Sequence, residues 1–197
     1  AASKLIYAHL NAHSTRIAST GFEPMITTKR LEIIPCEIRH LEAFARSREE
    51  LAKMLALRLP PSWPAFPEAY APPETAAPDP RPWGSYFFLC PALGSLVGSG
   101  GFKGKPDSTG TVEIGYEIGK EHWNRGFASE ATQGMIDFAF RHEEVKFVTA
   151  HTLAEQNASC TVLQKSGLTF IREINDPTDG NIWFWQISKE EHAKPLS

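Results

Sequence analysis

One short segment places a cation, a glycine and small side chains at the start of an expected helix. Residues 121–131 read EHWNRGFASEA, with Arg125 directly before Gly126 and with Ala128 and Ser129 soon after it. The first N–H groups of a helix have no partner within the helix, and the helix dipole makes that end partly positive. Phosphate binds such amides readily, glycine lets it come close, and arginine adds charge-assisted hydrogen bonds. The segment therefore predicts an anion-binding site or, as the plainer alternative, a turn with a solvated arginine.

A β-α-β unit is expected to position this segment. Residues 111–119 (TVEIGYEIG) read as a strand, residues 126–144 as a helix with one apolar face, and residues 147–153 as a largely apolar, buried strand. A crossover of this kind makes its two strands parallel neighbours in one sheet. Glu130 falls in the first helical turn, where an acid suits the dipole but would repel a phosphate. We therefore expect its side chain to point aside.

The remaining segments predict a mixed α/β (α+β) sheet with helices on both faces. The expected elements, in chain order, are a strand at 31–35, one bent helix or two short helices at 36–59, three antiparallel strands within 84–119, a helix at 157–167, and a hairpin formed by strands 168–174 and 181–187.

Residues 59–83 are rich in proline, which excludes regular structure. A long loop of this kind in a compact domain is usually functional or disordered, and its aromatic side chains favour a lid or a pocket wall. We expect residues 1–26 to form an arm of unknown role, residues 27–190 to form the domain, and residues 191–197 to form a tail.

Composition excludes several classes of protein. The net charge of −3, from 20 Lys+Arg and 23 Asp+Glu, gives no basic footprint for nucleic acid. No segment approaches the roughly 20 apolar residues of a membrane span, and we expect no signal peptide. The odd set of cysteines, Cys36, Cys90 and Cys160, argues against a disulfide framework and a zinc site. A reducing, cytoplasmic location is the expectation.

Separately spaced segments resemble one protein family in the same order. EIGYEIGKEHWNRGFASEA resembles the acetyl-CoA segment of the GNAT superfamily of N-acyltransferases, in its RimJ/RimL-like branch, and HTLAEQNASCTVLQKSGLTF resembles the next segment of that branch. The likeness reaches back to TTKRLEIIP and LPPSWP and covers about residues 28–187. Trp123 stands where the general superfamily pattern begins with Gln or Arg, as is frequent in this branch. The resemblance implies an N-acetyltransferase with acetyl-CoA as co-substrate and no metal.

The family fold splays two parallel strands at the centre of a mixed, mostly antiparallel sheet of about seven strands. By resemblance these are residues 111–119 and 147–153, the pantetheine arm of coenzyme A lies in the gap between them, and the pyrophosphate sits on the amides of residues 125–129. The cofactor-binding residues that the resemblance implies are Tyr116, Glu117, Ile118, Asn124, Arg125, Gly126, Phe127, Ala128, Ser129 and Asn157.

The resemblance also implies roles in transfer of the acyl group from a thioester to an amine. Glu113 is the expected general base, directly or through water, and the alternative is an ordinary exposed strand residue. Glu117 lies on the same face of the strand and is a rival base. His122 and His151 are weaker candidates, because a lone histidine is more often structural.

The expected proton donor to the leaving thiolate departs from the family pattern. Leu163 stands where many GNAT enzymes have a tyrosine. Ser159, the serine of the N-A-S segment, is the expected substitute, with helix capping as its alternative role. Asn157 is expected to order the strand end and to touch the cofactor. Cys160 has no clear base beside it and is expected to be a buried thiol.

The acceptor is expected to be a protein N-terminal α-amine or a small-molecule amine. Trp63, Trp83, Trp183 and Trp185 are candidates for its pocket wall, although an aromatic stripe is usually core. Two alternatives stay open, namely another acyl-CoA as donor and a non-catalytic acyl-CoA-binding or regulatory module, which Leu163 favours. We expect a monomer or a homodimer.

Overall fold

The computed structural model describes residues 25–72, 81–178 and 180–194. Most of the expected arm, residues 73–80 of the proline-rich segment and the last three residues of the expected tail lie outside this described part. The family likeness therefore falls almost entirely within the residues that the structure describes.

The described residues form one sheet of eight strands in the order β1-β2-β3-β4-β5-β6-β8-β7. Every neighbouring pair is antiparallel except β5 and β6, which are parallel. The strands are β1 (Ile26–Thr27), β2 (Glu32–Pro35), β3 (Ser85–Cys90), β4 (Ser95–Phe102), β5 (Thr111–Ile118), β6 (Phe147–Leu153), β7 (Thr169–Asp176) and β8 (Gly180–Ser188). The predicted mixed sheet of about seven strands is confirmed, and the additional strand is the two-residue β1.

Helices and 3₁₀ turns connect these strands. They are α1 (Ile38–Arg46), α2 (Arg48–Leu55), η1 (Pro67–Tyr70), η2 (Pro91–Leu93), η3 (Lys120–His122), α3 (Phe127–Phe140), α4 (Ala158–Lys165) and α5 (Lys189–His192). Of the two alternatives for residues 36–59, two short helices is correct. Ser47 separates them with an extended φ of −169°, and its hydroxyl accepts a hydrogen bond from Glu50 N–H at the start of α2.

The sheet has a hydrophobic core on each face, because side chains alternate along a strand. On β3, Tyr86 and Phe88 belong to the core covered by α3 and α4, on what we call the first face. Phe87 and Leu89 belong to the core covered by α1 and α2, on the second face. The expected helices on both faces are therefore confirmed.

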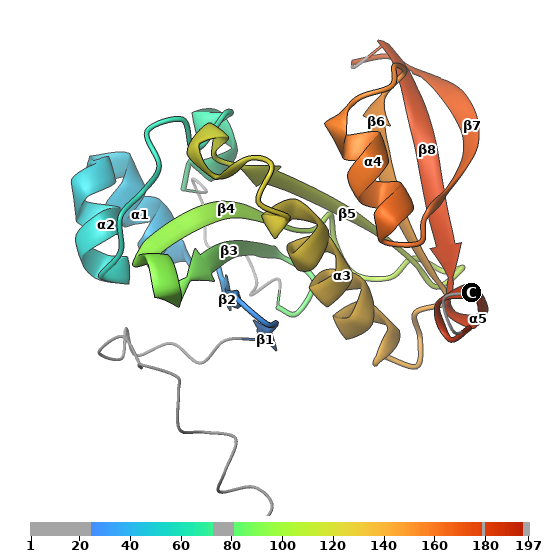
Figure 1. The fold of residues 1–197 in the computed structure, drawn as a ribbon, viewed down its shortest axis with the longest axis horizontal. Coiled ribbons are helices and arrows are strands. Elements are labelled where there is room, and N and C mark those ends of the chain that lie inside the picture. Colours follow the sequence, from blue (N-terminus) through green and yellow to red (C-terminus); the bar gives the residue numbers. More distant parts are fainter. Residues whose placement is uncertain (1–24, 73–80, 179, 195–197) are drawn as a thin grey trace, which may run out of the picture.

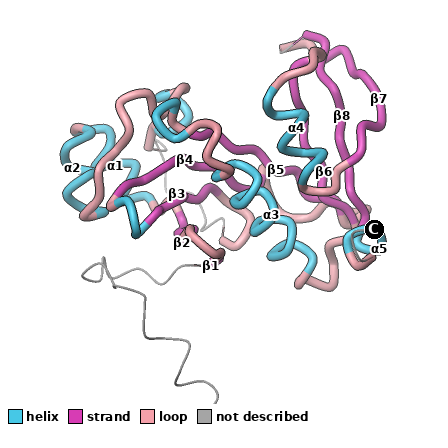
Figure 2. The backbone as a smooth tube through the Cα atoms, viewed as in Figure 1, coloured by secondary structure: helices cyan, strands magenta, loops and turns pink. Residues whose placement is uncertain are grey.

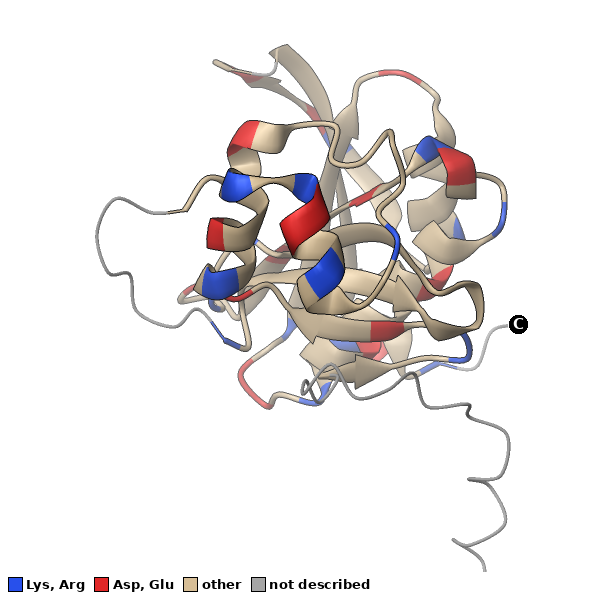
Figure 3. Ribbon diagram, turned by 90° about the vertical axis from the view of Figure 1, so that its left-hand side faces the viewer, with Lys and Arg blue, Asp and Glu red and all other residues tan. Residues whose placement is uncertain are grey.

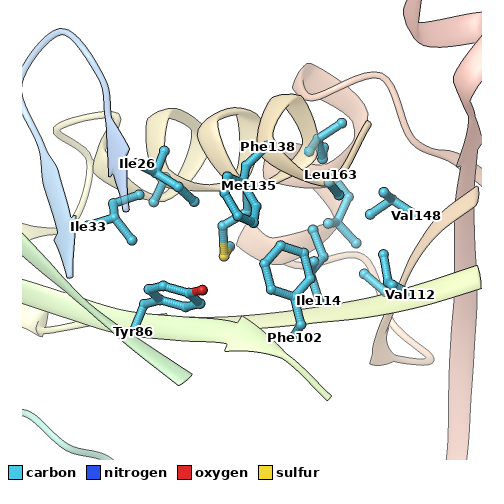
Figure 4. Packing of buried hydrophobic residues seen from close by; sticks show 14 of the residues in the cluster. Ile26, Ile33, Tyr86, Phe102, Val112, Ile114, Met135, Phe138, Val148 and Leu163 are labelled. Atoms are coloured by element: carbon cyan, nitrogen blue, oxygen red, sulfur yellow. The ribbon is translucent and has the colours of Figure 1, made fainter. Parts of the chain in front are cut away.

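Helix α3 packs its apolar side along the middle of the sheet. Met135 and Phe138 point from the helix toward Tyr86, Phe102 and Ile114 on the strands below (Figure 4). This packing fixes the position of the N-terminus of α3 relative to β5, which the helix follows in the chain.

The parallel pair separates soon after it begins. Strands β5 and β6 pair only from Thr111–Phe147 to Glu113–Thr149, whereas β5 stays paired with β4 as far as Ile118. Beyond that point β5 and β6 diverge, with α3 beside one strand and α4 beside the other (Figures 1 and 2). The expected splayed pair is present, and its gap opens toward the C-terminal ends of both strands.

Candidate active site

A cleft of about 630 Å³ occupies the gap between the diverging strands. Its walls come from the end of β5, from η3 and the turn before α3, from the first turn of α3, from the whole length of α4, and from the loop that precedes η1. The lining residues are Ser62, Ala65, Tyr116, Glu117, Ile118, Lys120, His122, Trp123, Asn124, Gly126, Phe127, Ala128, Ser129, Ala158, Ser159, Thr161, Val162 and Lys165. Most of the residues expected from the sequence to bind a cofactor therefore meet in one cavity.

The edge of β5 presents backbone groups to this cleft. Gly119 N–H donates to Val97 C=O, and Lys103 N–H donates to Glu113 C=O, so the odd-numbered residues of β5 bond to β4. The alternation of an antiparallel ladder then directs the N–H and C=O groups of Tyr116 and Ile118 toward the gap. Pairing with β6 has already ended at this point. An extended ligand with amide groups could complete the ladder there.

Trp123 contacts this edge directly. Its indole N–H donates to Ile118 C=O at 2.7 Å, while 55% of the residue remains exposed. The residue that departs from the general superfamily pattern thus lines the cleft and holds the last carbonyl of β5.

The N-terminus of α3 is left open by its own turn. Gly126, the residue before the helix, has a left-handed φ of +78°, and no side chain caps the first amides. Asn124 is also left-handed, with φ of +57°, a conformation that asparagine tolerates better than most residues. Phe127, Ala128 and Ser129 follow and line the cleft. The arrangement offers free N–H donors at the positive end of a helix dipole.

Arg30 ties the first turn of α3 to the N-terminal hairpin. Its Nε donates to Glu130 Oε2 at 2.6 Å, its backbone N–H to Oε1 at 2.6 Å, and its Nη1 to Arg125 C=O at 2.8 Å. Thr28 Oγ1 also donates to Glu130 at 2.6 Å. Burial raises the pKa of Glu130, but these hydrogen bonds outweigh burial and hold it below its ordinary value. The carboxylate therefore points away from the open amides, as expected from the sequence, and its negative charge is balanced by Arg30.

Helix α4 borders the cleft with a capped N-terminus. Asn157 Oδ1 accepts a hydrogen bond from Cys160 N–H at 3.1 Å, so Asn157 rather than Ser159 is the cap. Ser159 lines the cleft, and its carbonyl lies 3.5 Å from the hydroxyl of Tyr116. Burial raises the pKa of Tyr116 to about 12, so this hydroxyl keeps its proton at neutral pH.

Two residues of α4 lie in the core. Leu163 and Cys160 are both fully buried on the first face. Cys160 Sγ lies 3.6 Å from Thr152 Oγ1 and 3.4 Å from Glu155 C=O. Neither residue lines the cleft, so neither presents a reactive group to a ligand there.

Glu113 lies on the second face, at the last paired position of β5 and β6. Its Oε1 lies 2.5 Å from Lys103 Nζ and 2.9 Å from His151 Nδ1. Burial raises the pKa of Glu113, but the hydrogen bonds from Lys103 and His151 outweigh burial and lower it below its ordinary value. Glu113 and His151, considered separately in the sequence, form one hydrogen-bonded pair.

Glu117, the rival base, connects the cleft to the loop before η1. Its Oε2 accepts Ala65 N–H at 2.8 Å and its Oε1 accepts the Tyr70 hydroxyl at 3.0 Å. Ser62 is held in a similar way by Glu121, at 2.6 Å between Ser62 Oγ and Oε2. Residues 62–70 therefore pack against β5 and η3 and form part of the cleft wall, which agrees with the expected pocket wall.

His122 lines the cleft from η3. Burial lowers its pKa, with the charge of Arg125 as a further cause. Its Nε2 lies 3.4 Å from Ser95 Oγ, and its Nδ1 lies 3.5 Å from Arg125 Nη1. These contacts agree with the structural role that a lone histidine usually has.

The four candidate tryptophans do not line the cleft. Trp63 is 1% exposed and donates from its indole N–H to Ser99 Oγ, and Trp185 is 2% exposed and donates to Thr152 Oγ1. Trp83 is buried against Phe102, and only Trp183 is half-buried. Their contact with an acceptor stays a prediction.

Two residues that were expected at the cofactor, Arg125 and Asn157, flank the cleft without lining it.

Sequence reasoning missed the partners that reach the site from distant segments. Arg30 and Lys103 were not singled out at all. Arg30 lies 100 residues before its partner Glu130, and no local spacing signals such a contact. The match to the family segment around TTKRLEIIP was the only available hint.

A family model described as an acetyltransferase (GNAT) domain matches residues 30–169. The chain belongs to the GNAT acetyltransferase family. The family predicted from the sequence is therefore confirmed.

Relatives and solved structures agree with this family. An uncharacterized N-acetyltransferase of Bacillus licheniformis, p20, is 32% identical over 103 residues, which cover 50% of this chain and 58% of that protein. The chain thus spans little more than half the length of this curated relative. A GNAT-family acetyltransferase from Bacillus anthracis superposes with a TM-score of 0.58 at 20% identity, over 84% of this chain and 98% of that one. RimL, a ribosomal-protein α-N-acetyltransferase in complex with coenzyme A, gives 0.59 at 13% identity over the same shares. Both structures support the fold.

The surface of this GNAT domain carries both signs of charge. Lys and Arg are interspersed with Asp and Glu over the described elements (Figure 3). No helix among the described residues is long and apolar enough to cross a membrane. Within the same residues, no group of three or more His, Cys, Asp and Glu side chains could hold a metal ion.

Proposed function

We propose that this chain is an acetyl-CoA-dependent N-acetyltransferase that acetylates a primary amine by direct attack in a ternary complex. The amine nitrogen attacks the thioester carbonyl, the C–N bond of an amide forms, and the C–S bond breaks. Coenzyme A leaves as the thiolate and takes up a proton, while the amine gives one up. The observation that most supports this reaction is the cleft between β5 and β6, which brings open helix amides and an unpaired strand edge into one cavity.

The residues around the cleft fit acetyl-CoA, which supplies the acetyl group as a thioester. The open amides from Gly126 to Ser129 suit the pyrophosphate, with Arg125 close by. The N–H and C=O of Tyr116 and the N–H of Ile118 suit the amides of the pantetheine arm, while Ile118 C=O already accepts the indole N–H of Trp123. A volume of about 630 Å³ lies in the usual range for a ligand site. Asn124, Glu117 and Asn157 complete the proposed binding set.

The amine must lose a proton, because a primary alkyl amine near pKa 10 is mostly protonated at neutral pH. We assign this task to the pair formed by Glu113 and His151, on the second face at the point where the strands diverge. A general base at this position contributes about 10²–10⁴-fold to the rate. Ser159, which lines the cleft, is the proposed donor toward the leaving sulfur.

The acceptor enters, in this proposal, from the second face. Residues 62–70 and Glu117 form the wall there. Of the four candidate tryptophans, Trp63 lies in the core behind this wall and would support it, whereas Trp83, Trp183 and Trp185 pack on the first face of the sheet. A protein N-terminal α-amine and a small-molecule amine are both compatible with this opening. RimL, whose fold is shared, acts on a ribosomal protein, so peptides belong in any test.

A thiol-release assay over a panel of amines and N-terminal peptides tests the proposal. Acetyl-CoA is the donor, free coenzyme A is measured with a thiol reagent, and donor affinity is measured separately by calorimetry. We expect acetyl-CoA binding together with release of coenzyme A that depends on at least one acceptor. Binding without release on any acceptor would instead support the non-catalytic acyl-CoA module, which Leu163 in place of the usual tyrosine favours.

A further inference from the structure

We infer that His151 is the residue that takes the proton from the acceptor amine, and that Glu113 positions its ring. This inference rests on the proposed function and divides the work within the Glu113–His151 pair. Four arguments support it. They are the hydrogen bonds that Glu113 already accepts, the tautomer of His151 that follows from them, the location of the pair and the packing of the His151 ring.

The carboxylate of Glu113 is already occupied. A single oxygen, Oε1, lies within hydrogen-bond distance of both Lys103 Nζ, at 2.5 Å, and His151 Nδ1, at 2.9 Å. A carboxylate that accepts charge-assisted hydrogen bonds is favoured in its ionised form and is a weak proton acceptor. Glu113 is therefore better suited to hold a neighbour than to take the proton itself.

The tautomer of His151 follows from this contact. An ionised carboxylate only accepts hydrogen bonds, so Nδ1 of His151 must carry the hydrogen. The lone pair of the neutral ring is then on Nε2, for which the described residues provide no hydrogen-bond partner. An imidazole ordinarily titrates close to neutral pH, which suits a general base in that range.

The pair lies where the gap opens. Glu113 and Thr149 are the last paired residues, so Gly115 and His151 are the next positions of the second face on the two strands. A Cβ on Gly115 would meet no atom within 4 Å, so the space beside it is open. Glu117, one step further on the same face, already lines the cleft. Gly115 and His151 do not line the cleft themselves, and the open space beside Gly115 lies between Glu117 and the Glu113–His151 pair on the second face, about 7 Å per pair of residues along the strand.

Packing fixes the ring of His151 without enclosing it. The ring lies 5.3 Å from that of Phe184, and Arg172 lies over Phe184 at 5.2 Å from its centroid. The side chain of His151 is 25% exposed. The charged groups around it are Glu113 from β5, Lys103 from the connection between β4 and β5, and Arg172 from β7 behind Phe184.

The proton balance of the step is simple. As the amine nitrogen forms its bond to the thioester carbon, His151 Nε2 takes the proton from that nitrogen. The C–S bond breaks, the coenzyme A sulfur takes up a proton, and the imidazolium releases its proton to solvent. No oxidant, reductant or metal is needed.

The variant His151→Asn tests the inference, because the asparagine amide can still donate to Glu113 while the basic nitrogen is lost. We expect kcat to fall about 100-fold, within the usual contribution of a general base, with KM for acetyl-CoA changed less than about twofold. At acidic pH, log(kcat/KM) of the wild type should fall with a slope one unit steeper than that of the variant, because a protonated imidazole cannot take the proton. The control is His192→Gln, since His192 pairs with Asp137 at 3.0 Å and is also 25% exposed but lies away from the cleft. The control should retain the wild-type rate and slope.

A spectroscopic readout is independent of turnover. In ¹⁵N spectra of the neutral rings, His151 should show the Nδ1–H tautomer in the wild type and should lose that preference in Glu113→Leu. A wild-type Nε2–H tautomer would overturn the inference even if the enzyme is active. So would a His151→Asn variant with at least half of the wild-type rate and an unchanged pH profile. Absence of acceptor-dependent release by the wild type would instead remove the proposed function, and this inference with it.

Discussion

Two helix N-termini border the same cleft and begin in different ways. Helix α3 begins after Gly126, which has a left-handed φ of +78° and no side-chain cap. Helix α4 begins after Asn157, which is extended and whose Oδ1 accepts the hydrogen bond of Cys160 N–H. Both ends carry the positive pole of a helix dipole, so the dipole alone does not distinguish them.

The difference concerns which amides remain available. A capping oxygen takes one of the donors that an anion would otherwise use, and it stabilises the helix by about 1 kcal/mol. At α4 the chain satisfies this amide itself. At α3 the amides stay open, and Glu130, the acid in the first turn, is bound by Thr28 and Arg30 instead of lying across the helix end. We therefore expect the N-terminus of α3 to bind a ligand, and we expect the cap at the N-terminus of α4 to stabilise the fold.

The substitution Gly126→Asp should have the largest effect, because it would place a carboxylate at the open end of α3. Asp tolerates the left-handed region better than most residues, although its Cβ would lie 3.3 Å from Arg30 Nη2. Repulsion of the pyrophosphate should weaken acetyl-CoA binding about 100-fold, or about 2.7 kcal/mol, measured by calorimetry. The neutral Gly126→Asn has nearly the same size and should lose tenfold or less. Equal losses of acetyl-CoA affinity in both variants would show that charge at this helix end does not affect binding of the donor.

The substitution Arg30→Met should have the next largest effect. It removes the cation from Glu130 and a donor from Arg125 C=O, so an uncompensated carboxylate would remain beside the open amides. We expect about tenfold weaker acetyl-CoA binding, or about 1.4 kcal/mol, and partial recovery when Glu130→Gln is added. The control Arg46→Met breaks an exposed pair with Glu50 of the same 2.6 Å length on the far helices. If both variants bind alike, Arg30 does not contribute to the site.

The substitution Asn157→Ala tests the capped end. Loss of the cap should lower the free energy of unfolding by about 1 kcal/mol, measured in urea, and Asn157→Ser should restore most of it. A loss of stability with donor affinity unchanged would confine Asn157 to capping. A parallel loss of acetyl-CoA affinity would indicate that Asn157 also contacts the cofactor, as we expected from the sequence. Unchanged stability would contradict the comparison of the two helix ends.

The sequence predicted the parts of this site that depend on local patterns. The β5-α3-β6 unit follows from hydrophobic periodicities of two and 3.6 residues, and Gly126 was expected because a residue without a side chain lets an anion approach the first amides of a helix. Its left-handed φ of +78° was not predicted. The splay of β5 and β6 came from the family resemblance alone, since nothing in either strand's own pattern indicates where pairing stops.

Contacts between distant segments could not be predicted in this way. Lys103, Glu113 and His151 come together from three segments whose charges and spacing look ordinary when taken singly. The tryptophans failed as a guide for a related reason. A large aromatic side chain suits a pocket wall and a core equally well, and Trp63 and Trp185 find hydrogen-bond partners inside the core.

The smallest predicted effect is a pH dependence at Glu130, which sharpens the claim that this acid serves the fold and not the helix end. Because hydrogen bonds from Thr28 and Arg30 outweigh burial, its pKa in the folded protein lies below the ordinary value. The carboxylate therefore stabilises the fold above its unfolded pKa, about 4.3, and this stabilisation is lost as pH falls through the lower folded value. The difference in unfolding free energy between wild type and Glu130→Gln should stay below about 1 kcal/mol at pH 6, after screening by solvent, and shrink below about pH 5. Glu50→Gln, at the exposed pair with Arg46, is the control and should change stability less. A difference in unfolding free energy that grows as pH falls would mean that the ionised carboxylate destabilises the fold. We would then conclude that the first-turn acid of α3 faces the ligand.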